Sequence, residues 1–295
     1  MANLLLSKEK KPFPPVVLVL FAVLLWSTGG LFIKLATNLD AYQVTFFRSL
    51  LAGITVLVIT RKNGLRINGF GVIASIIYAT LLFLFVWATK HTTAANAIFL
   101  QYTAPIYILI LAPFVIGEKF HLRDLATVIF CVAGMSLFFV GDLTIGDYQG
   151  NVAALGSGIF LGLYIMLLKH PRAVGMNSVI TVIYGNFLLA LLTLPSGIAA
   201  LPTATWRDYA AVGFLGVFQI GISYILFIKG VTGGTRPLDA SIIGFIEPLL
   251  NPVWVFLFVG ERPSQWALLG GAIIVATVCV HTLVQYRNKP AAIAT

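Results

Sequence analysis

The chain has 295 residues, of which 59% are hydrophobic and only 10% are charged. A soluble protein carries about 25% charged residues, so this composition and the mean hydropathy of +0.97 exclude a soluble domain. Despite a net charge of +9, no nucleic-acid partner is expected, because the basic residues lie in short stretches between apolar segments. These segments are continuous over about 20 residues and therefore predict membrane-spanning helices.

Apolar segments of this length follow one another along the whole chain. They predict ten transmembrane helices, at residues 15–37, 41–60, 70–89, 94–116, 122–141, 150–169, 177–195, 207–228, 237–259 and 265–286. With a cytoplasmic N-terminus, 14 basic residues fall at the inner ends of these spans and three at the outer ends. The positive-inside rule thus predicts an all-α polytopic membrane protein with both termini cytoplasmic.

Two stretches that lie 143 positions apart share one pattern, because residues 78–119 align without a gap with residues 221–262. The alignment pairs Pro105 with Pro248, Gly117 with Gly260, Glu118 with Glu261, and Lys119 with Arg262. Each half contains five predicted spans, an odd number, so the second half would insert upside down relative to the first. We therefore predict two inverted five-helix repeats, residues 1–145 and 146–295, an architecture typical of secondary transporters.

Glu247 lies beside Pro248 deep in the ninth predicted span, where hydrocarbon solvates neither a charge nor an unpaired carbonyl. Pro248 frees the carbonyl of Gly244, and Pro105 frees that of Gln101. The two prolines are predicted hinges at matching positions, with static packing kinks as the alternative. Glu247 has three candidate roles: a carboxylate that exchanges protons, a partner for a substrate ammonium group, or a partner for Arg48.

Other polar and aromatic residues inside the spans predict a cavity for a mostly apolar solute with a polar end. Arg48, within the second span, either reaches the membrane interface or binds a carboxylate through its planar guanidinium. Gly244, Glu247 and Asn251 share one face of the ninth span. The predicted substrate-binding residues are Trp26, Arg48, Tyr78, Gln101, Tyr102, Tyr164, Tyr224, Gly244, Glu247 and Asn251.

Small residues and charged pairs predict close contacts and gates. The run Gly156-Ser157-Gly158 with Gly162 would let the sixth span approach a neighbour closely, and Gly270-Gly271 would do so in the tenth. The pairs Glu118-Lys119 and Glu261-Arg262 lie at helix ends on opposite membrane faces. They are predicted to be solvated anchors or ion pairs that close opposite gates.

The sequence carries no pattern of an enzyme. The four histidines lie at or near span ends, and there is neither a His-Glu-x-x-His metal spacing nor a Gly-Lys-Ser/Thr phosphate loop. We therefore predict no enzymatic activity, no cofactor and no metal site, with an intramembrane enzyme as the remote alternative. Transport would run on substrate or ion gradients.

Trp26 in the first span, Phe46-Phe47-Arg48 in the second, and the Pro-to-Gly-Glu pattern that ends spans four and nine resemble the drug/metabolite transporter superfamily. The resemblance is to its ten-helix form with two EamA domains, and it covers nearly the whole chain. It implies alternating-access transport of small metabolites through a central cavity lined from both halves.

Within the superfamily the chain most resembles bacterial exporters of amino acids, including the aromatic amino acids. This implies outward movement of neutral or aromatic amino acids across the bacterial cytoplasmic (inner) membrane. Efflux of cationic drugs is the alternative. The expected partners are a small-molecule substrate and the lipid bilayer, and both a monomer and a homodimer are open.

Overall fold

The computed structural model describes residues 13–92, 94–138, 148–259 and 265–287, which form helices and no strand. The first half contains α1 (Pro15–Trp26), α2 (Gly29–Leu35), α3 (Ala41–Thr60), η1 (Arg61–Asn63), α4 (Gly69–His91), α5 (Ala94–Gln101), α6 (Ala104–Val115) and α7 (Leu122–Phe138). The second half contains α8 (Tyr148–Leu167), η2 (Pro171–Ala173), α9 (Ile180–Leu192), α10 (Leu194–Ala200), α11 (Trp206–Phe214), the π-helical η3 (Leu215–Ile222), α12 (Ser223–Thr232), α13 (Pro237–Gly244), α14 (Ile246–Val259) and α15 (Gln265–Arg287).

Six stretches of the described chain are long and apolar enough to cross a membrane, or seven if the bent pair α9 and α10 is one span. The six are Pro15–Leu35, Ala41–Thr60, Gly69–His91, Asn96–Val115, Tyr148–Leu167 and Trp206–Thr232. Helices also occupy the three remaining predicted ranges, as α7, as α13 with α14, and as α15. The fold is thus all-helical with six or seven candidate spans, and the count of ten stays a prediction.

Polar caps fix where several helices begin. Asp40 caps α3 and exchanges hydrogen bonds with Gln43, and Thr205 caps α11 and does the same with Asp208. Each cap satisfies backbone N–H groups of the first turn, which have no partner within the helix. These caps start the helices sharply at the membrane ends, where the loops are short.

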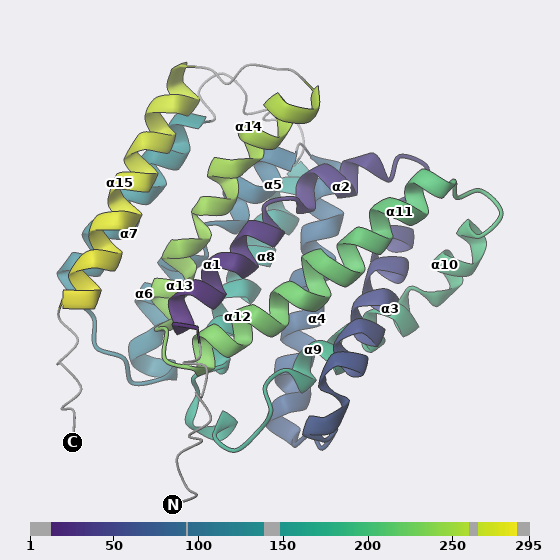
Figure 1. Cartoon of the computed structure of the whole chain (residues 1–295), viewed down its shortest axis with the longest axis horizontal. Coiled ribbons are helices and arrows are strands. Elements are labelled where there is room, and N and C mark those ends of the chain that lie inside the picture. The colour runs from purple at the N-terminus through teal and green to yellow at the C-terminus, as the bar shows by residue number, and fades with distance from the viewer. Residues whose placement is uncertain (1–12, 93, 139–147, 260–264, 288–295) are drawn as a thin grey trace, which may run out of the picture.

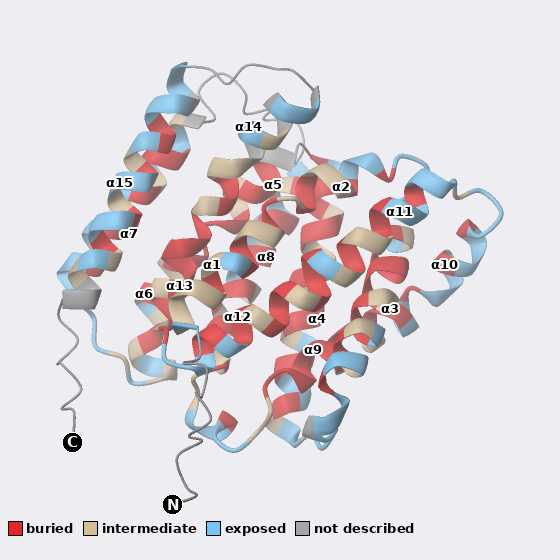
Figure 2. Cartoon of the chain, in the orientation of Figure 1, coloured by how far each residue is buried: buried red, intermediate tan, exposed pale blue. Residues whose placement is uncertain are grey.

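Helices of the two halves alternate in the packing. α1 packs against α12, α4 packs against α8 and α9, and α3 packs against α9 and η3. α7 and α15 lie side by side along one edge of the molecule, and α1 begins on the same side on which α15 ends (Figure 1). Buried residues gather on the central helices, whereas exposed ones lie on outer faces and at helix ends (Figure 2). Helices of both halves therefore meet at the centre of the molecule.

Two helices break at the positions that the prolines predicted. α5 ends at Gln101 before α6 begins at Ala104, and α13 ends at Gly244 before α14 begins at Ile246. Neither Pro105 nor Pro248 can donate a hydrogen bond to the carbonyl four residues earlier, so the regular helical pattern stops there.

Small residues of α8 cover the first break, which confirms the predicted close approach of the sixth span. A Cβ atom on Gly158 would lie 2.7 Å from the carbonyl oxygen of Gln101 and 3.0 Å from Oγ1 of Thr103. The prediction for the tenth span is also confirmed, because a Cβ atom on Gly134 of α7 would lie 3.0 Å from the carbonyl oxygen of Gly270. Only a glycine fits against a neighbouring backbone this closely.

We predict that Gly158→Ala destabilises the protein by about 1–3 kcal/mol, because the added methyl group forces α8 away from the break between α5 and α6. Gly213→Ala is the matched control, since a Cβ atom there meets nothing within 4 Å and alanine is the better helix former by about 1 kcal/mol. Thermal unfolding of both variants in detergent checks this. Equal midpoints for the two variants would contradict the close contact.

Candidate functional site

A small cavity lies at the centre of the molecule, and both halves contribute to its lining. The lining residues are Trp26, Arg48, Leu81, Leu82, Phe85, Gln101, Tyr102, Leu161, Gln219, Ile220, Tyr224 and Glu247. About 30 Å³ is open to the centres of water-sized molecules, which is room for about two waters. A solute larger than two waters does not fit this volume.

Six of the ten predicted substrate-binding residues line this cavity: Trp26, Arg48, Gln101, Tyr102, Tyr224 and Glu247. Gly244 lies directly beside it, because a Cβ atom there would be 2.8 Å from Cε1 of Tyr102. Asn251 belongs to α14, but its side chain is outside the part of the chain that the structure describes. The role of these residues in substrate binding stays a prediction.

Tyr78 and Tyr164 form a second layer behind Tyr224. The ring centroid of Tyr224 lies 4.8 Å from that of Tyr78 and 6.3 Å from that of Tyr164. The hydroxyl of Tyr78 accepts a hydrogen bond from Asn186 at 3.1 Å, and that of Tyr164 pairs with Thr181 at 2.8 Å. Because both hydroxyls bond to helix α9, these two tyrosines support the cavity wall.

Arg48 is wholly buried in α3, so it does not reach the membrane interface. Its Nη2 atom donates a hydrogen bond to the carbonyl oxygen of Leu82 at 3.2 Å. Its Nε and Nη1 atoms are buried without a hydrogen-bond partner. A buried guanidinium with unpaired N–H groups is costly unless an acceptor meets it during function.

Glu247 is 4% exposed and lies at the start of α14, directly after the second helix break. The hydroxyl of Tyr102 donates a hydrogen bond to its Oε2 atom at 2.6 Å. Among the described side chains, Glu247 and Arg48 form no ion pair with each other. The cavity therefore carries an acidic and a basic group that are held apart.

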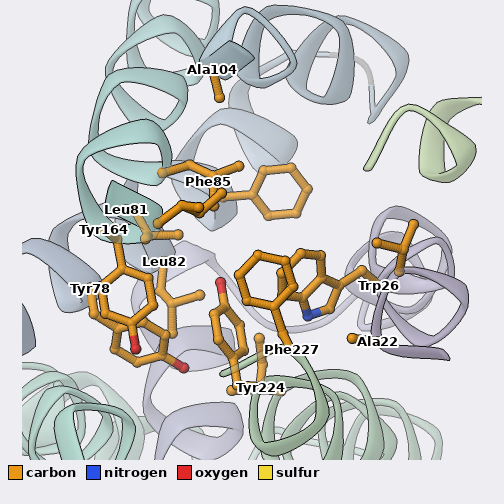
Figure 3. Packing of buried hydrophobic residues seen from close by; sticks show 14 of the residues in the cluster. Ala22, Trp26, Tyr78, Leu81, Leu82, Phe85, Ala104, Tyr164, Tyr224 and Phe227 are labelled. Atoms are coloured by element: carbon orange, nitrogen blue, oxygen red, sulfur yellow. The ribbon is translucent and has the colours of Figure 1, made fainter. Parts of the chain in front are cut away.

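Aromatic rings form a large part of the apolar wall, together with leucine and isoleucine side chains (Figure 3). The ring of Trp26 lies 4.9 Å from that of Tyr224 and 4.7 Å from that of Phe227. The indole N–H of Trp26 donates to the hydroxyl of Ser223 at 2.8 Å, so its polar edge is satisfied by α12. Phe85 faces the same space from α4 (Figure 3).

The predicted set omitted Gln219, which lines the cavity from the π-helix η3. Its Oε1 atom is buried without a hydrogen-bond partner. The available signal was a lone amide inside an apolar run, the same signal that identified Gln101. The π-helix itself gave no sequence signal, although such segments are frequent at functional sites.

An ionic cluster joins the halves at the end of the molecule where α1 begins, and we call it the inner latch because that end is predicted to face the cytoplasm. Arg236, just before α13, binds Glu118, Asp124 at 2.9 Å and Asp239 at 3.6 Å. Burial would lower the pKa of the Arg236 guanidinium, but the hydrogen bonds to Asp124 and Glu118 raise it above its ordinary value. Arg236 therefore stays charged, and it is the partner of Glu118 across the halves.

The opposite end is joined by hydrogen bonds, which we call the outer link. Asn38 donates to Oδ2 of Asp208 at 2.9 Å, and Thr92 donates to Oδ1 of Asn151 at 3.2 Å. Glu261 and Arg262, the predicted outer gate pair, lie outside the described residues. Contacts between the halves thus hold both ends of the described structure together around the central cavity.

The EamA-like transporter family matches the chain over residues 13–140 and again over residues 148–283. The chain belongs to this family. Its members are transporters, so the central cavity is the candidate site of an EamA transporter. The membrane character of the fold follows from the family and from the candidate spans.

Several curated proteins are similar over most of this EamA chain. A transporter of Archaeoglobus fulgidus is 25% identical, with 92% of this chain and 98% of that protein covered. The pseudopaline exporter of Pseudomonas aeruginosa is 23% identical, with 88% and 93% covered. A probable terminal-alkyne amino-acid exporter of Streptantibioticus cattleyicolor is 22% identical, with 65% of each chain covered. A solved crystal structure superposes with a TM-score of 0.77 at 20% identity, over 92% of this chain and 98% of the other, which shows the fold alone.

We predict that Tyr102 and Glu247 are energetically coupled by about 1.5–3 kcal/mol, the range for a hydrogen bond to a charged group. A double-mutant cycle with Tyr102→Phe and Glu247→Met, read as free energy of unfolding in detergent, measures this coupling, because each substitution removes one partner of the hydrogen bond. Tyr107→Phe combined with Glu247→Met is the control, because Tyr107 neither lines the cavity nor bonds to Glu247. Equal coupling in both cycles would show that the hydrogen bond contributes nothing.

Proposed function

We propose that this EamA transporter exports neutral or aromatic amino acids across the bacterial cytoplasmic membrane by alternating access. One observation carries the proposal: the cavity between the halves holds a buried guanidinium, a buried carboxylate and an aromatic wall. Such a lining suits a small solute with a charged polar end and an apolar body. The exporter names of two relatives support outward movement.

The packing supports an inverted repeat of residues 1–145 and 146–295. In the proposed repeat α1 corresponds to α8, α4 to α12, α5 to α13 and α6 to α14. The contact of α4 with α8 then has its equivalent in that of α12 with α1, and the contacts of α5 and α6 with α8 have theirs in those of α13 and α14 with α1. The pairs α7 with α15 and α3 with α9 each join two corresponding helices. The two segments matched by the family have nearly the same boundaries as the proposed repeats. Both support two five-helix repeats, and an odd number of spans in each repeat would invert the second half.

Alternating access then follows from the two ends. The inner latch would open to admit solute from the cytoplasm while the outer link stays closed, and the reverse would release it. The broken helices α5/α6 and α13/α14 supply two hinges beside the cavity, one before Pro105 and one before Pro248. With both termini cytoplasmic, the inner latch faces the cytoplasm.

Efflux of cationic compounds is the second candidate function. It is favoured by the buried carboxylate of Glu247, which would pair with a substrate cation. The guanidinium of Arg48 in the same cavity disfavours it, because this charge repels a cation that brings no carboxylate of its own.

We predict that the purified protein in liposomes exchanges neutral amino acids in a counterflow assay. The panel contains aliphatic and aromatic amino acids, nucleosides, polyamines and cationic dyes, each with and without a proton gradient. Exchange of at least one neutral amino acid is expected. Exchange of dyes alone would support the second candidate function, and no exchange of any compound would reject both.

We predict that Arg236→Gln opens the cavity toward the inner side. The readout is the reaction of a membrane-impermeant maleimide with a single cysteine, introduced by Leu161→Cys after Cys131 and Cys279 are replaced by alanine. Labelling from the inner side should rise several-fold, and labelling from the outer side should fall. Arg172→Gln, which removes an exposed arginine charge at the same predicted face, should change neither rate. Unchanged labelling in Arg236→Gln would reject the inner latch as a gate.

A further inference from the structure

We propose that Arg48 and Glu247 form a zwitterion site that binds both charged ends of one α-amino acid. The guanidinium of Arg48 would bind the substrate carboxylate, and the carboxylate of Glu247 would bind the substrate ammonium group. This inference deepens the proposed function and rests on it, because it assigns the substrate class to two side chains of the same cavity.

The part of the site that would bind the substrate carboxylate consists of N–H groups of Arg48 that have no acceptor. The Nε and Nη1 atoms of Arg48 are buried and unpaired, whereas Nη2 is anchored on the carbonyl of Leu82. This anchor holds the guanidinium plane in one orientation at the cavity wall. A planar guanidinium with free N–H groups matches a carboxylate, which offers two oxygen acceptors and the opposite charge. A neutral ligand would supply acceptors but would leave the buried charge without a counter-charge.

The ammonium half is defined by acceptors. Tyr102 binds Oε2 of Glu247, and no hydrogen bond of the described residues engages Oε1. The Oε1 atom of Gln219, buried without a partner, lines the same cavity. An ammonium group carries three N–H donors, so a carboxylate oxygen and an amide oxygen together suit it. Gln219, which the sequence prediction missed, is thereby a specificity-determining residue.

The two halves of the site must be filled together. Arg48 and Glu247 line one small cavity but form no ion pair with each other. An amine without a carboxylate would neutralise Glu247 and leave Arg48 unpaired, and an acid without an ammonium group would do the reverse. Each leaves a buried charge uncompensated, so the site rejects both analogues and accepts the zwitterion.

The two charged residues come from different halves of the chain. Arg48 belongs to α3, and Glu247 begins the helix segment that follows the second break. A bound zwitterion would therefore bridge the halves, and only this ligand would favour closure around itself. Substrate recognition and closure would then depend on the same two contacts.

The test uses three ligands with one aromatic body: phenylalanine, phenethylamine and 3-phenylpropionate. Binding is measured as the ligand-dependent rise of the unfolding midpoint of the purified full chain in detergent, which avoids leakage of the amine across liposomes. If leucine exchanges better than phenylalanine, leucine, isopentylamine and 4-methylpentanoate replace the three. The zwitterion should bind about 100-fold more tightly than either analogue.

Variants then separate recognition from a structural role. Arg48→Gln should weaken the binding of phenylalanine until phenethylamine binds equally well. Glu247→Gln should weaken the binding of phenylalanine until 3-phenylpropionate binds equally well. Arg48→Lys keeps the charge but loses the planar fork, so it should weaken phenylalanine about 10-fold and preserve the order of the three ligands. Arg172→Gln, remote from the cavity, should match the unmodified protein.

The outcomes are distinct. Equal binding of the amine and the zwitterion by the unmodified protein overturns the zwitterion site but leaves a transporter in place. Equal loss of all three ligands in Arg48→Gln also overturns it, because this marks a structural role. If Arg48→Gln does not fold, the ligand series on the unmodified protein and on Arg48→Lys still decides. If no compound of the wider counterflow panel is exchanged, the proposed function itself fails.

Discussion

A broken helix inside a membrane exposes backbone carbonyls that hydrocarbon cannot solvate. This constraint determines how the helices pack at the centre of the structure. Both breaks lie against protein. Gly158 lets α8 press onto the carbonyl of Gln101, and the ring of Tyr102 lies over Gly244. Because the exposed carbonyls at both breaks must face protein and not lipid, the polar side chains beside the two breaks meet at the centre of the molecule. The cavity is the space that remains between them.

The two breaks share geometry but not chemistry. The 143-residue offset pairs Gln101 with Gly244, Tyr102 with Phe245, and Ala104 with Glu247. The hydroxyl of Tyr102 in the first half binds the carboxylate of Glu247 in the second half. The two breaks thus contribute different groups to one asymmetric site, because each supplies the group that the matching position of the other lacks.

Much of the fold was predictable because polar residues and prolines are conspicuous in apolar segments. Such residues are energetically costly in hydrocarbon, so they are expected to be buried in protein with a partner. For this reason the helix ranges, both breaks and six cavity residues follow from the sequence. Partners across the halves were not predictable from spacing. The pairing of Glu118 with Arg236 and the turning of Tyr78 toward Asn186 depend on tertiary packing. The π-helix was not predictable because its eight residues, Leu215–Ile222, are almost all apolar and therefore carry no polar pattern from which a helical period can be read.

Different kinds of interaction join the halves at the two ends of the molecule. The inner latch consists of formal charges, of which Arg236 is 27% and Glu118 20% exposed while Asp124 is buried. The outer link contains one carboxylate, that of Asp208, and otherwise amide and hydroxyl groups. Dissolved ions screen the first kind of contact far more than the second, since the Debye length falls from about 8 Å at 0.15 M to about 3 Å at 1 M ionic strength. Concentrated salt should therefore weaken the partly exposed contacts of the inner latch more than the hydrogen bonds of the outer link.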